Sequence, residues 1–294
     1  MKPICLTEHF TDFFKNDYIY VDKTERIFNL VEYQERIFIS RTHGYGKTLI
    51  LDTIATLFEK GIDPYFKGTW IYKEWKDSFY PVLRLNFKKY SLTDLDKFMQ
   101  ELVSDITAFA KENGVKSYHE DKSPRSSIAS LLDSLDDAER RIVILIDDYD
   151  HQLKANINNE DFYNKLNEIL RCFYAVIKDH GAIRFLCLTS FYKFREDPYL
   201  NDVVSDIIDI SKDSFYSELF GFSRDEIKKY YIEYLKLAAS KKFQCPVDDV
   251  TDKQIDSTLE KIAIFCGESS FDEFKEKKVC CPLSINLFLA NLVE

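Results

Sequence analysis

The residues best suited to chemistry are the eight of Arg41–Thr48, which read RTHGYGKT and lie between an apolar run and a segment of helical periodicity. A phosphate-binding loop needs inward-pointing backbone N–H groups, a helix N-terminus behind them and a lysine that reaches the terminal phosphates. Gly44 and Gly46 permit the positive φ angles of such a loop. Lys47 would pair with the β- and γ-phosphates, and the Thr48 hydroxyl would hold Mg²⁺. The pattern therefore predicts a nucleotide-binding loop.

The first half of this loop departs from the usual pattern. In G-x-x-x-x-G-K-[ST] the first glycine falls at position 41, where this chain has Arg41. The phosphates are held chiefly from the second half of the loop onward, so the loop can still bind them. A glycine-rich turn that only caps a helix is the alternative interpretation. The loop residues predicted to contact the nucleotide are Arg41, Thr42, His43, Gly44, Tyr45, Gly46, Lys47 and Thr48.

A second segment favours the nucleotide-binding interpretation. The residues IVILIDDYD, 142 to 150, form an aliphatic run that ends in an acidic pair, which is typical of a Walker B strand. In that role Asp147 supports the hydration shell of the metal, and Asp148 orients or polarises the attacking water. The alternative is that both carboxylates only end a buried strand and cap the turn that follows.

A third segment ends in polar residues at the tip of a predicted strand, Cys187-Leu-Thr-Ser190. If this strand lies between the loop strand and the acidic strand, Thr189 or Ser190 can hydrogen-bond the γ-phosphate or its attacking water. Arg41 or Arg195 is a further candidate for the γ-phosphate, although a surface ion pair is the competing role for Arg195. The candidate catalytic residues are therefore Lys47, Asp148, Thr189 and Ser190.

Apolar runs alternate with helical patterns through about residue 210, which predicts an α/β fold with a mostly parallel sheet flanked by helices, of the P-loop NTPase type. The run that ends in Asp147 is purely aliphatic before it, as expected for a strand covered on both faces. The five predicted strands are Arg36 to Ser40, Pro81 to Phe87, Ile142 to Asp147, Ile183 to Thr189 and Val204 to Ile210.

From about Phe215 onward the pattern is helical. Capping boxes at Ser223-Arg-Asp-Glu226 and Thr251-Asp-Lys-Gln254 open two amphipathic helices, and no strand pattern intervenes. We therefore predict an α/β core over residues 1–214 and an all-helical lid subdomain over residues 215–294.

The composition limits the class of protein. A chain of 294 residues with 45% hydrophobic residues can bury a substantial core. It has no apolar run of about 18 residues and no leader pattern, so we expect a cytoplasmic protein without a membrane partner. Its net charge of -10 argues against a general nucleic-acid coat, because that affinity comes mainly from Lys and Arg. Its seven cysteines show no C-x-x-C spacing, so we expect reduced and mostly buried thiols.

Several motifs in a fixed order give the chain a family resemblance. They are Tyr20-Val-Asp-Lys-Thr24, Arg41 to Thr48, Tyr80-Pro-Val82, Leu145-Ile-Asp-Asp-Tyr-Asp150, Gly221-Phe-Ser223 and Cys281-Pro-Leu-Ser284. The chain resembles the AAA-ATPase-like family of bacterial proteins, whose members often carry a C-terminal PD-(D/E)XK nuclease-like domain. The resemblance implies ATP and Mg²⁺ as ligands, and it explains Arg41, because the family loop also begins with arginine.

The same resemblance implies that two other segments approach the base and ribose. These are the Tyr20 to Thr24 segment, with Asp22 and Lys23, and the turn from Cys281 to Ser284. The chain stops where the family's nuclease-like domain would begin, and its two [DE]-x-K matches fall in a capped helix and in a charged run. Nuclease activity is therefore not predicted.

Two departures from the family pattern bear on activity. The loop has Thr42-His43-Gly44-Tyr45 where the family has Pro-Arg-Arg-Phe, which removes two arginines beside the phosphates. The acidic pair has Asp148 where the family has Glu, one methylene longer. Because small misplacements of a catalytic group cost on the order of 100-fold in rate, we expect slow turnover.

The leading hypothesis is an ATP-binding module, a slow Mg²⁺-dependent AAA-like ATPase that acts as a nucleotide-dependent switch. A catalytically degenerate P-loop protein that serves as a protein-interaction module is one alternative. A DNA-associated ATPase of a defence or genome-maintenance system is another, although the net charge does not support a nucleic-acid partner. An arginine finger from a neighbouring subunit would imply a homo-oligomer.

Overall fold

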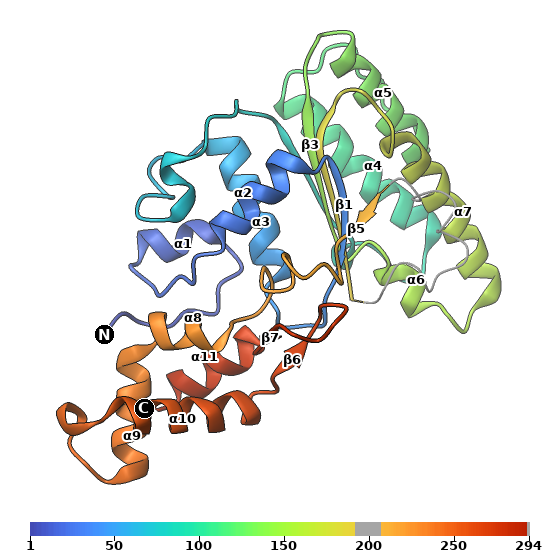
Figure 1. The fold of residues 1–294 in the computed structure, drawn as a ribbon. Coiled ribbons are helices and arrows are strands. Elements are labelled where there is room, and N and C mark those ends of the chain that lie inside the picture. Colours follow the sequence, from blue (N-terminus) through green and yellow to red (C-terminus); the bar gives the residue numbers. More distant parts are fainter. Residues whose placement is uncertain (192–206, 293–294) are drawn as a thin grey trace.

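The computed structural model describes residues 1–191 and 207–292, and its centre is a five-stranded sheet in the order β2-β3-β4-β1-β5 (Figure 1). Every pairing in this sheet is parallel. The strands are β1 (Arg36–Ser40), β2 (Val82–Asn86), β3 (Ile142–Asp147), β4 (Ile183–Ser190) and β5 (Ile208–Asp209). The predicted α/β fold with a parallel sheet is thus confirmed, and β4 lies between β1 and β3. Of the predicted strand over 204–210, residues 204–206 lie outside the described residues, as does Arg195.

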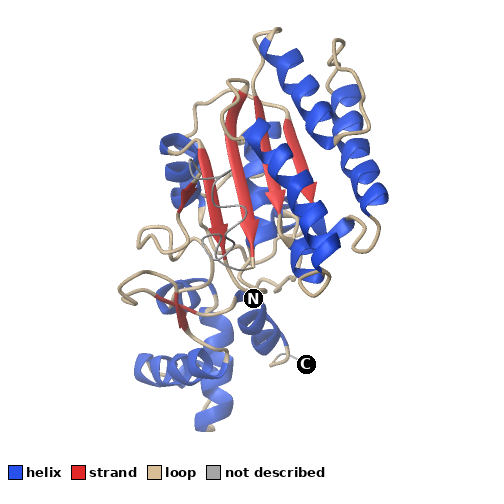
Figure 2. Cartoon of the chain, turned by 90° about the vertical axis from the view of Figure 1, so that its right-hand side faces the viewer, coloured by secondary structure: helices blue, strands red, loops and turns tan. Residues whose placement is uncertain are grey.

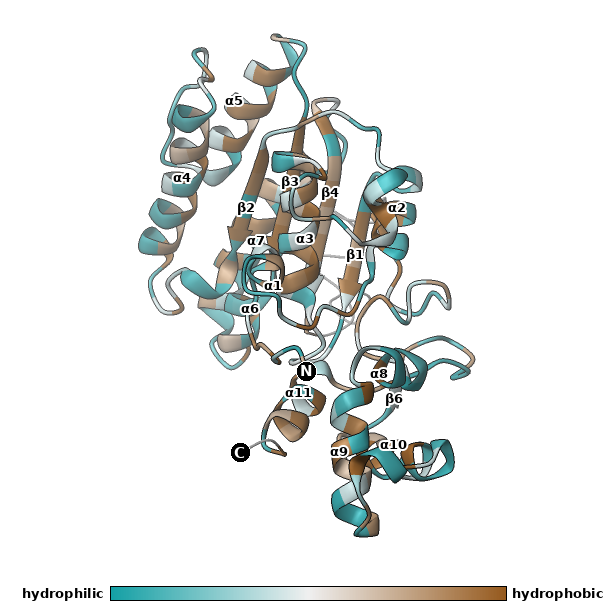
Figure 3. Ribbon diagram, turned by 90° about the vertical axis from the view of Figure 1, so that its left-hand side faces the viewer, coloured by the Kyte–Doolittle hydropathy of each residue, from teal (hydrophilic) through white to brown (hydrophobic). Residues whose placement is uncertain are grey.

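Helices cover both faces of the sheet. Alternate strand residues point to opposite faces, so that Ile144 packs in one apolar cluster whereas Val143 and Leu145 pack in the other. The helices on one side are α1 (Phe10–Lys15), α2 (Thr24–Tyr33) and α3 (Lys47–Lys60). Those on the other side are α4 (Leu95–Glu112), α5 (Pro124–Asp136), α6 (His151–Ala155) and α7 (Glu160–Ile177). The hydropathy colouring agrees, because the strands are apolar along most of their length (Figure 3).

The strands end towards a group of C-terminal helices (Figure 2). These are α8 (Arg224–Tyr230), α9 (Ile232–Phe243), α10 (Asp252–Phe265) and α11 (Pro282–Ala290), which share an apolar cluster with Ile19 and Val21 of the N-terminal segment. The two predicted capping boxes are confirmed, because Ser223 and Thr251 each accept a hydrogen bond from the backbone N–H three residues on.

The C-terminal segment is not exclusively helical, which corrects the prediction. Strands β6 (Ser269–Ser270) and β7 (Lys278–Val279) pair antiparallel between α10 and α11. Each strand has only two residues, and such a strand is too short to show the alternation of apolar and polar residues by which strands are recognised. Within residues 1–191 and 207–292, no helix combines the length and the apolar character that crossing a bilayer requires.

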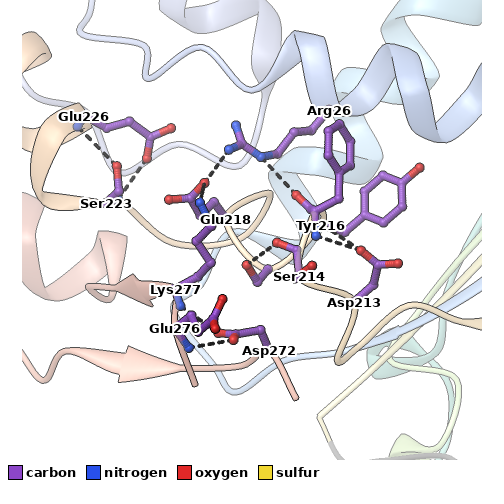
Figure 4. Close-up of polar contacts among 12 residues, drawn as sticks. Arg26, Asp213, Ser214, Tyr216, Glu218, Ser223, Glu226, Asp272, Glu276 and Lys277 are labelled. Atoms are coloured by element: carbon purple, nitrogen blue, oxygen red, sulfur yellow. Dashed lines mark hydrogen bonds and ion pairs between the residues drawn. The ribbon is translucent and has the colours of Figure 1, made fainter. Parts of the chain in front are cut away.

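A polar junction joins the core to the C-terminal segment (Figure 4). Arg26 of α2 donates from Nε to the backbone oxygen of Phe215 at 3.2 Å and forms an ion pair with Glu218. The Nζ atom of Lys277, near β7, lies 3.9 Å from the same Glu218 carboxylate. Glu218 therefore connects a core helix to the strand pair of the C-terminal segment.

We expect the substitution Glu218→Gln to lower the free energy of unfolding by about 1–2 kcal/mol, because it removes a charge-assisted hydrogen bond between partly buried partners. The side chains of Arg26 and Glu218 are 24% and 17% exposed. Urea unfolding measures the change. Lys165→Gln is the matched control, since it breaks an ion pair whose partners are 60% and 80% exposed and should cost no more than about 0.5 kcal/mol. An equal effect of the two substitutions would show that Glu218 does not hold the junction.

Candidate functional site

The predicted phosphate loop joins the carboxyl end of β1 to the first turn of α3. Both Gly44 and Gly46 have φ of 85°, in the left-handed region that glycine adopts without strain. Gly46 is the N-cap of α3, and its carbonyl accepts the first hydrogen bond of that helix from Ile50. The loop therefore presents the N-terminus of a 14-residue helix at the carboxyl edge of the sheet, where backbone N–H groups and the helix dipole favour an anion.

The C-terminal segment packs directly on this loop. The backbone N–H of Leu283 donates to the Gly44 carbonyl at 3.2 Å, and the Cys281 thiol donates to the same oxygen at 3.5 Å. A Cβ atom at Gly44 would lie 2.8 Å from Cys281 Sγ and 3.2 Å from Leu283 Cβ. Only glycine allows this approach, so the start of α11 packs closely against the phosphate loop at Gly44.

Lys47 and Thr48 connect the loop to the acidic residues at the end of β3. Lys47 Nζ donates to the backbone oxygen of Arg41 at 2.8 Å and lies 4.0 Å from Asp148 Oδ1. Burial lowers the pKa of Lys47 from its ordinary value, although Asp148 and Asp147 oppose this effect. The Thr48 hydroxyl donates to Asp147 Oδ2 at 2.7 Å. The loop and the acidic strand thus meet at a hydroxyl and a carboxylate, which are oxygen ligands that Mg²⁺ accepts.

This donor set fits Mg²⁺ held partly by a nucleotide. Among the described residues, no group of three or more His, Cys, Asp or Glu side chains could hold a metal ion by itself. Mg²⁺ is commonly bound by one or two protein oxygens together with substrate phosphates and waters, and needs no complete protein cage. Thr48 and Asp147 are the two residues whose oxygens would serve that mode of binding.

The acidic pair at the end of β3 is tightly held. Asp147 Oδ1 accepts a hydrogen bond from the Thr189 hydroxyl at 2.5 Å. Asp148 has φ of 49°, in the left-handed region where Asp is among the residues found most often, and its backbone N–H donates to Thr189 Oγ1 at 3.2 Å. The Asp148 carboxylate forms an ion pair with Lys88 in addition to its proximity to Lys47. Asp148 therefore lies between two lysines.

Thr189 and Ser190 are fully buried at the end of β4, and neither lines the cavity described below. Thr189 donates to Asp147, and the Ser190 hydroxyl donates to Asp150 Oδ2 at 2.6 Å. Asp150 also forms an ion pair with Lys154. In this structure the two hydroxyls hold Asp147 and Asp150, and the predicted contact of one of them with the γ-phosphate stays a prediction.

A cavity of about 240 Å³ lies between the loop, the N-terminal segment and the C-terminal segment. Its lining is mainly apolar and includes three lysines, Lys23, Lys47 and Lys88, together with Thr48, as a site for a base and a phosphate chain requires. The lining residues are Cys5–Glu8, Phe13, Ile19–Val21, Lys23, His43–Ile50, Lys88, Leu219, Gly221, Phe222, Tyr231, Pro282, Leu283 and Asn286. It therefore brings together most of the predicted loop and parts of both segments expected near the base and ribose.

Lys23 lines the cavity, but its ammonium group is engaged elsewhere. Lys23 Nζ donates to both carboxylate oxygens of Glu226, at 2.5 and 2.6 Å, and to the Glu218 carbonyl at 2.8 Å. Burial lowers its pKa, and Glu226 opposes that shift. Asp22 is not among the cavity residues, because its carboxylate accepts from the backbone and hydroxyl of Thr24 at 2.9 and 2.7 Å. Lys23 thus ties the core to α8.

Arg41 and Thr42 also lie outside the cavity lining. The Arg41 guanidinium is 2% exposed and donates to the backbone oxygens of Ser211 and Ser40 at 2.6 and 2.8 Å. It also lies over the ring of Phe271, 4.5 Å from the centroid. Burial lowers the pKa of Arg41 to about 10. In this structure the Arg41 side chain anchors the base of the loop, and its predicted contact with a nucleotide stays a prediction.

Lys88 is a site residue that no sequence motif predicted. This lysine lies in a short 3-10 helix, η2 (Phe87–Lys89), directly after β2. The strand register explains its position, because β2 pairs with β3 and Asn86 lies opposite Asp147. A lysine two residues beyond Asn86 is therefore carried to the acidic pair once the strand order is known.

Comparisons with known proteins agree with this geometry. The chain matches a family model described as a predicted AAA-ATPase over residues 3–198. It is also similar to an uncharacterised protein in the vnfD 5′ region of Azotobacter chroococcum mcd 1, with 31% identity over 238 residues. That alignment covers 74% of this chain and 45% of the relative, so it spans less than half of the relative's length.

Proposed function

Because the chain belongs to the predicted AAA-ATPase family, a nucleotide-binding and ATPase-like class, we propose that it binds ATP with Mg²⁺ in the cavity above the phosphate loop and hydrolyses it slowly. The observation that carries the proposal is the hydrogen bond from Thr48 to Asp147 at 2.7 Å, beside Lys47 and within reach of one cavity. It joins the loop to the acidic strand where a metal and phosphates would lie.

The residues have separate roles in this proposal. The loop N–H groups from His43 to Thr48 bind the phosphates together with Lys47. The Thr48 hydroxyl and the Asp147 carboxylate hold Mg²⁺, which when bound neutralises phosphate charge. Asp148 orients the attacking water, and Thr189 fixes Asp147 through the hydrogen bond at 2.5 Å. The apolar lining excludes water from the base.

The C-terminal segment, residues 215–292, is the lid of this site and the moving part of a nucleotide-dependent switch. It contacts the loop through Leu283 and Cys281, and it contacts the Tyr20 to Thr24 segment through the pair of Lys23 with Glu226. A ligand that displaces the loop must therefore move the start of α11, since the Leu283 N–H is hydrogen-bonded to the Gly44 carbonyl at 3.2 Å. Such differential contact is what couples a ligand to a conformational equilibrium.

The test is calorimetry of ATP with the purified chain, with and without Mg²⁺, followed by measurement of phosphate release on the same sample. We expect saturable binding that Mg²⁺ strengthens, and slow phosphate release. In Thr48→Val the strengthening by Mg²⁺ should be lost while binding without Mg²⁺ persists. If the wild-type chain binds no ATP up to millimolar concentrations, the proposal fails and the interaction-module hypothesis takes its place.

A further inference from the structure

Lys88, which follows β2, is a cation that reaches the cavity from this edge of the sheet. It lines the cavity, its side chain is 44% exposed, and its ammonium group forms an ion pair with Asp148 Oδ2. The other carboxylate oxygen of Asp148 lies 4.0 Å from Lys47 Nζ. Although partial burial opposes it, the hydrogen bond to Asp148 raises the pKa of Lys88 above its ordinary value. In the structure, Asp148 is therefore neutralised from two sides.

A carboxylate in this state is poorly placed to orient a water molecule. Its Oδ2 atom forms an ion pair with the Lys88 ammonium group and its Oδ1 atom lies 4.0 Å from Lys47 Nζ, so both carboxylate oxygens lie beside a positive charge. The hydroxyls at the end of β4 do not offer a substitute, because those of Thr189 and Ser190 donate to Asp147 and Asp150. A polar contact to the terminal phosphate beyond those of Lys47 and the loop would therefore come from another element.

We propose, on the basis of the nucleotide binding argued above, that Lys88 recognises the terminal phosphate of a nucleoside triphosphate and releases Asp148 when it does so. The terminal phosphate carries more negative charge than one carboxylate and has three acceptor oxygens. Lys88 has a flexible four-carbon stem and a half-exposed head, so it can move between the two partners without unfolding its turn. A nucleoside diphosphate lacks the group that draws Lys88 away.

Two consequences follow from this exchange. Lys88 contributes to the affinity for ATP and not to the affinity for ADP, so it makes the site selective for the triphosphate. Asp148 becomes free to orient water only when a terminal phosphate is present. Asp148 also competes with the phosphate for Lys88, so it lowers the affinity for ATP.

The experiment is calorimetry of Mg²⁺-ATP and Mg²⁺-ADP with the full chain and four variants. For Lys88→Ala we expect ATP binding weakened about 10-fold and ADP binding changed less than about 2-fold. Lys88→Arg keeps the charge and should restore most of the preference for ATP. Asp148→Asn removes the competitor and should bind ATP more tightly than the wild-type chain. Lys89→Ala is the matched control, since Lys89 is exposed, adjacent and outside the cavity lining.

The results that would contradict the role of Lys88 can be told apart from those that would contradict the proposed function. If the wild-type chain binds ATP and Lys88→Ala weakens ATP and ADP equally, or neither, Lys88 does not read the terminal phosphate. Weaker ATP binding by Asp148→Asn would contradict the exchange itself. If the wild-type chain binds neither nucleotide, the proposed function fails and this proposal with it. Thermal unfolding of each variant, followed by circular dichroism, shows whether a loss of binding reflects a loss of fold.

Discussion

Replacing Lys47 with alanine is expected to weaken ATP binding by at least about 100-fold, because two or more charge-assisted hydrogen bonds to phosphate oxygens are lost together. In the structure Lys47 Nζ is held by the Arg41 carbonyl at 2.8 Å, so the ammonium group is already positioned over the loop. The side chain is 7% exposed, and a charge so well shielded from water interacts strongly with a phosphate. Calorimetry with Mg²⁺-ATP measures the change.

Lys60→Ala is the matched control for this experiment. Lys60 is the last residue of the same helix α3, and it is exposed far from the loop. It should leave ATP affinity unchanged, so a parallel loss in both variants would point to a general effect on α3. Unchanged affinity in Lys47→Ala would mean that the loop only caps a helix, which is the alternative that the sequence left open.

The parts of the fold that rest on local pattern were predictable. Strand β3 is apolar until its last residue, and all six of its residues are buried, as a strand covered on both faces must be. The capping boxes at Ser223 and Thr251 depend only on residues three apart. The strand order followed in part, because Thr189 was expected on a strand between the loop strand and the acidic strand.

The side-chain contacts that the sequence did not predict are those whose partners are distant in sequence. Arg41 resembles a phosphate ligand by its place in the loop, but its guanidinium contacts the Ser211 carbonyl and the Phe271 ring and does not line the cavity. A local pattern cannot show partners 170 or more residues away. The same holds for Lys23, whose partner Glu226 becomes available only when α8 packs against the core.

Lys88 shows the reverse case, a site residue without a motif. It belongs to no recognised pattern, and its position depends on the register that aligns β2 with β3. Given that register, any long cation two residues beyond Asn86 would reach the acidic pair. The sequence therefore shows the residue and its charge, but only the strand register places it beside the acidic pair.

The second large effect is expected at Asp148. Substitution with asparagine should lower phosphate release by about 100-fold or more, since a general base typically contributes 10²–10⁴-fold to a rate. ATP affinity should not fall in this variant, because Lys47 and Thr48 are unchanged and Asp148 no longer competes for Lys88. A loss of turnover with retained binding separates a role in the chemical step from a role in binding.

The wild-type rate is itself expected to be slow, so Asp148→Glu provides the complementary test. Glutamate is the residue that the family pattern carries at this position, and its additional methylene extends the carboxylate towards the space beside Lys47. We expect phosphate release to rise by about 10-fold or more, since small displacements of a catalytic group change rates by that order. The variant should also lose about 1 kcal/mol of stability, because Asp148 has φ of 49° and glutamate is less favourable there than aspartate. Equal rates for Asp, Asn and Glu at this position would show that the carboxylate takes no part in hydrolysis, and that the ion pair with Lys88 is a fixed feature of a nucleotide-binding switch.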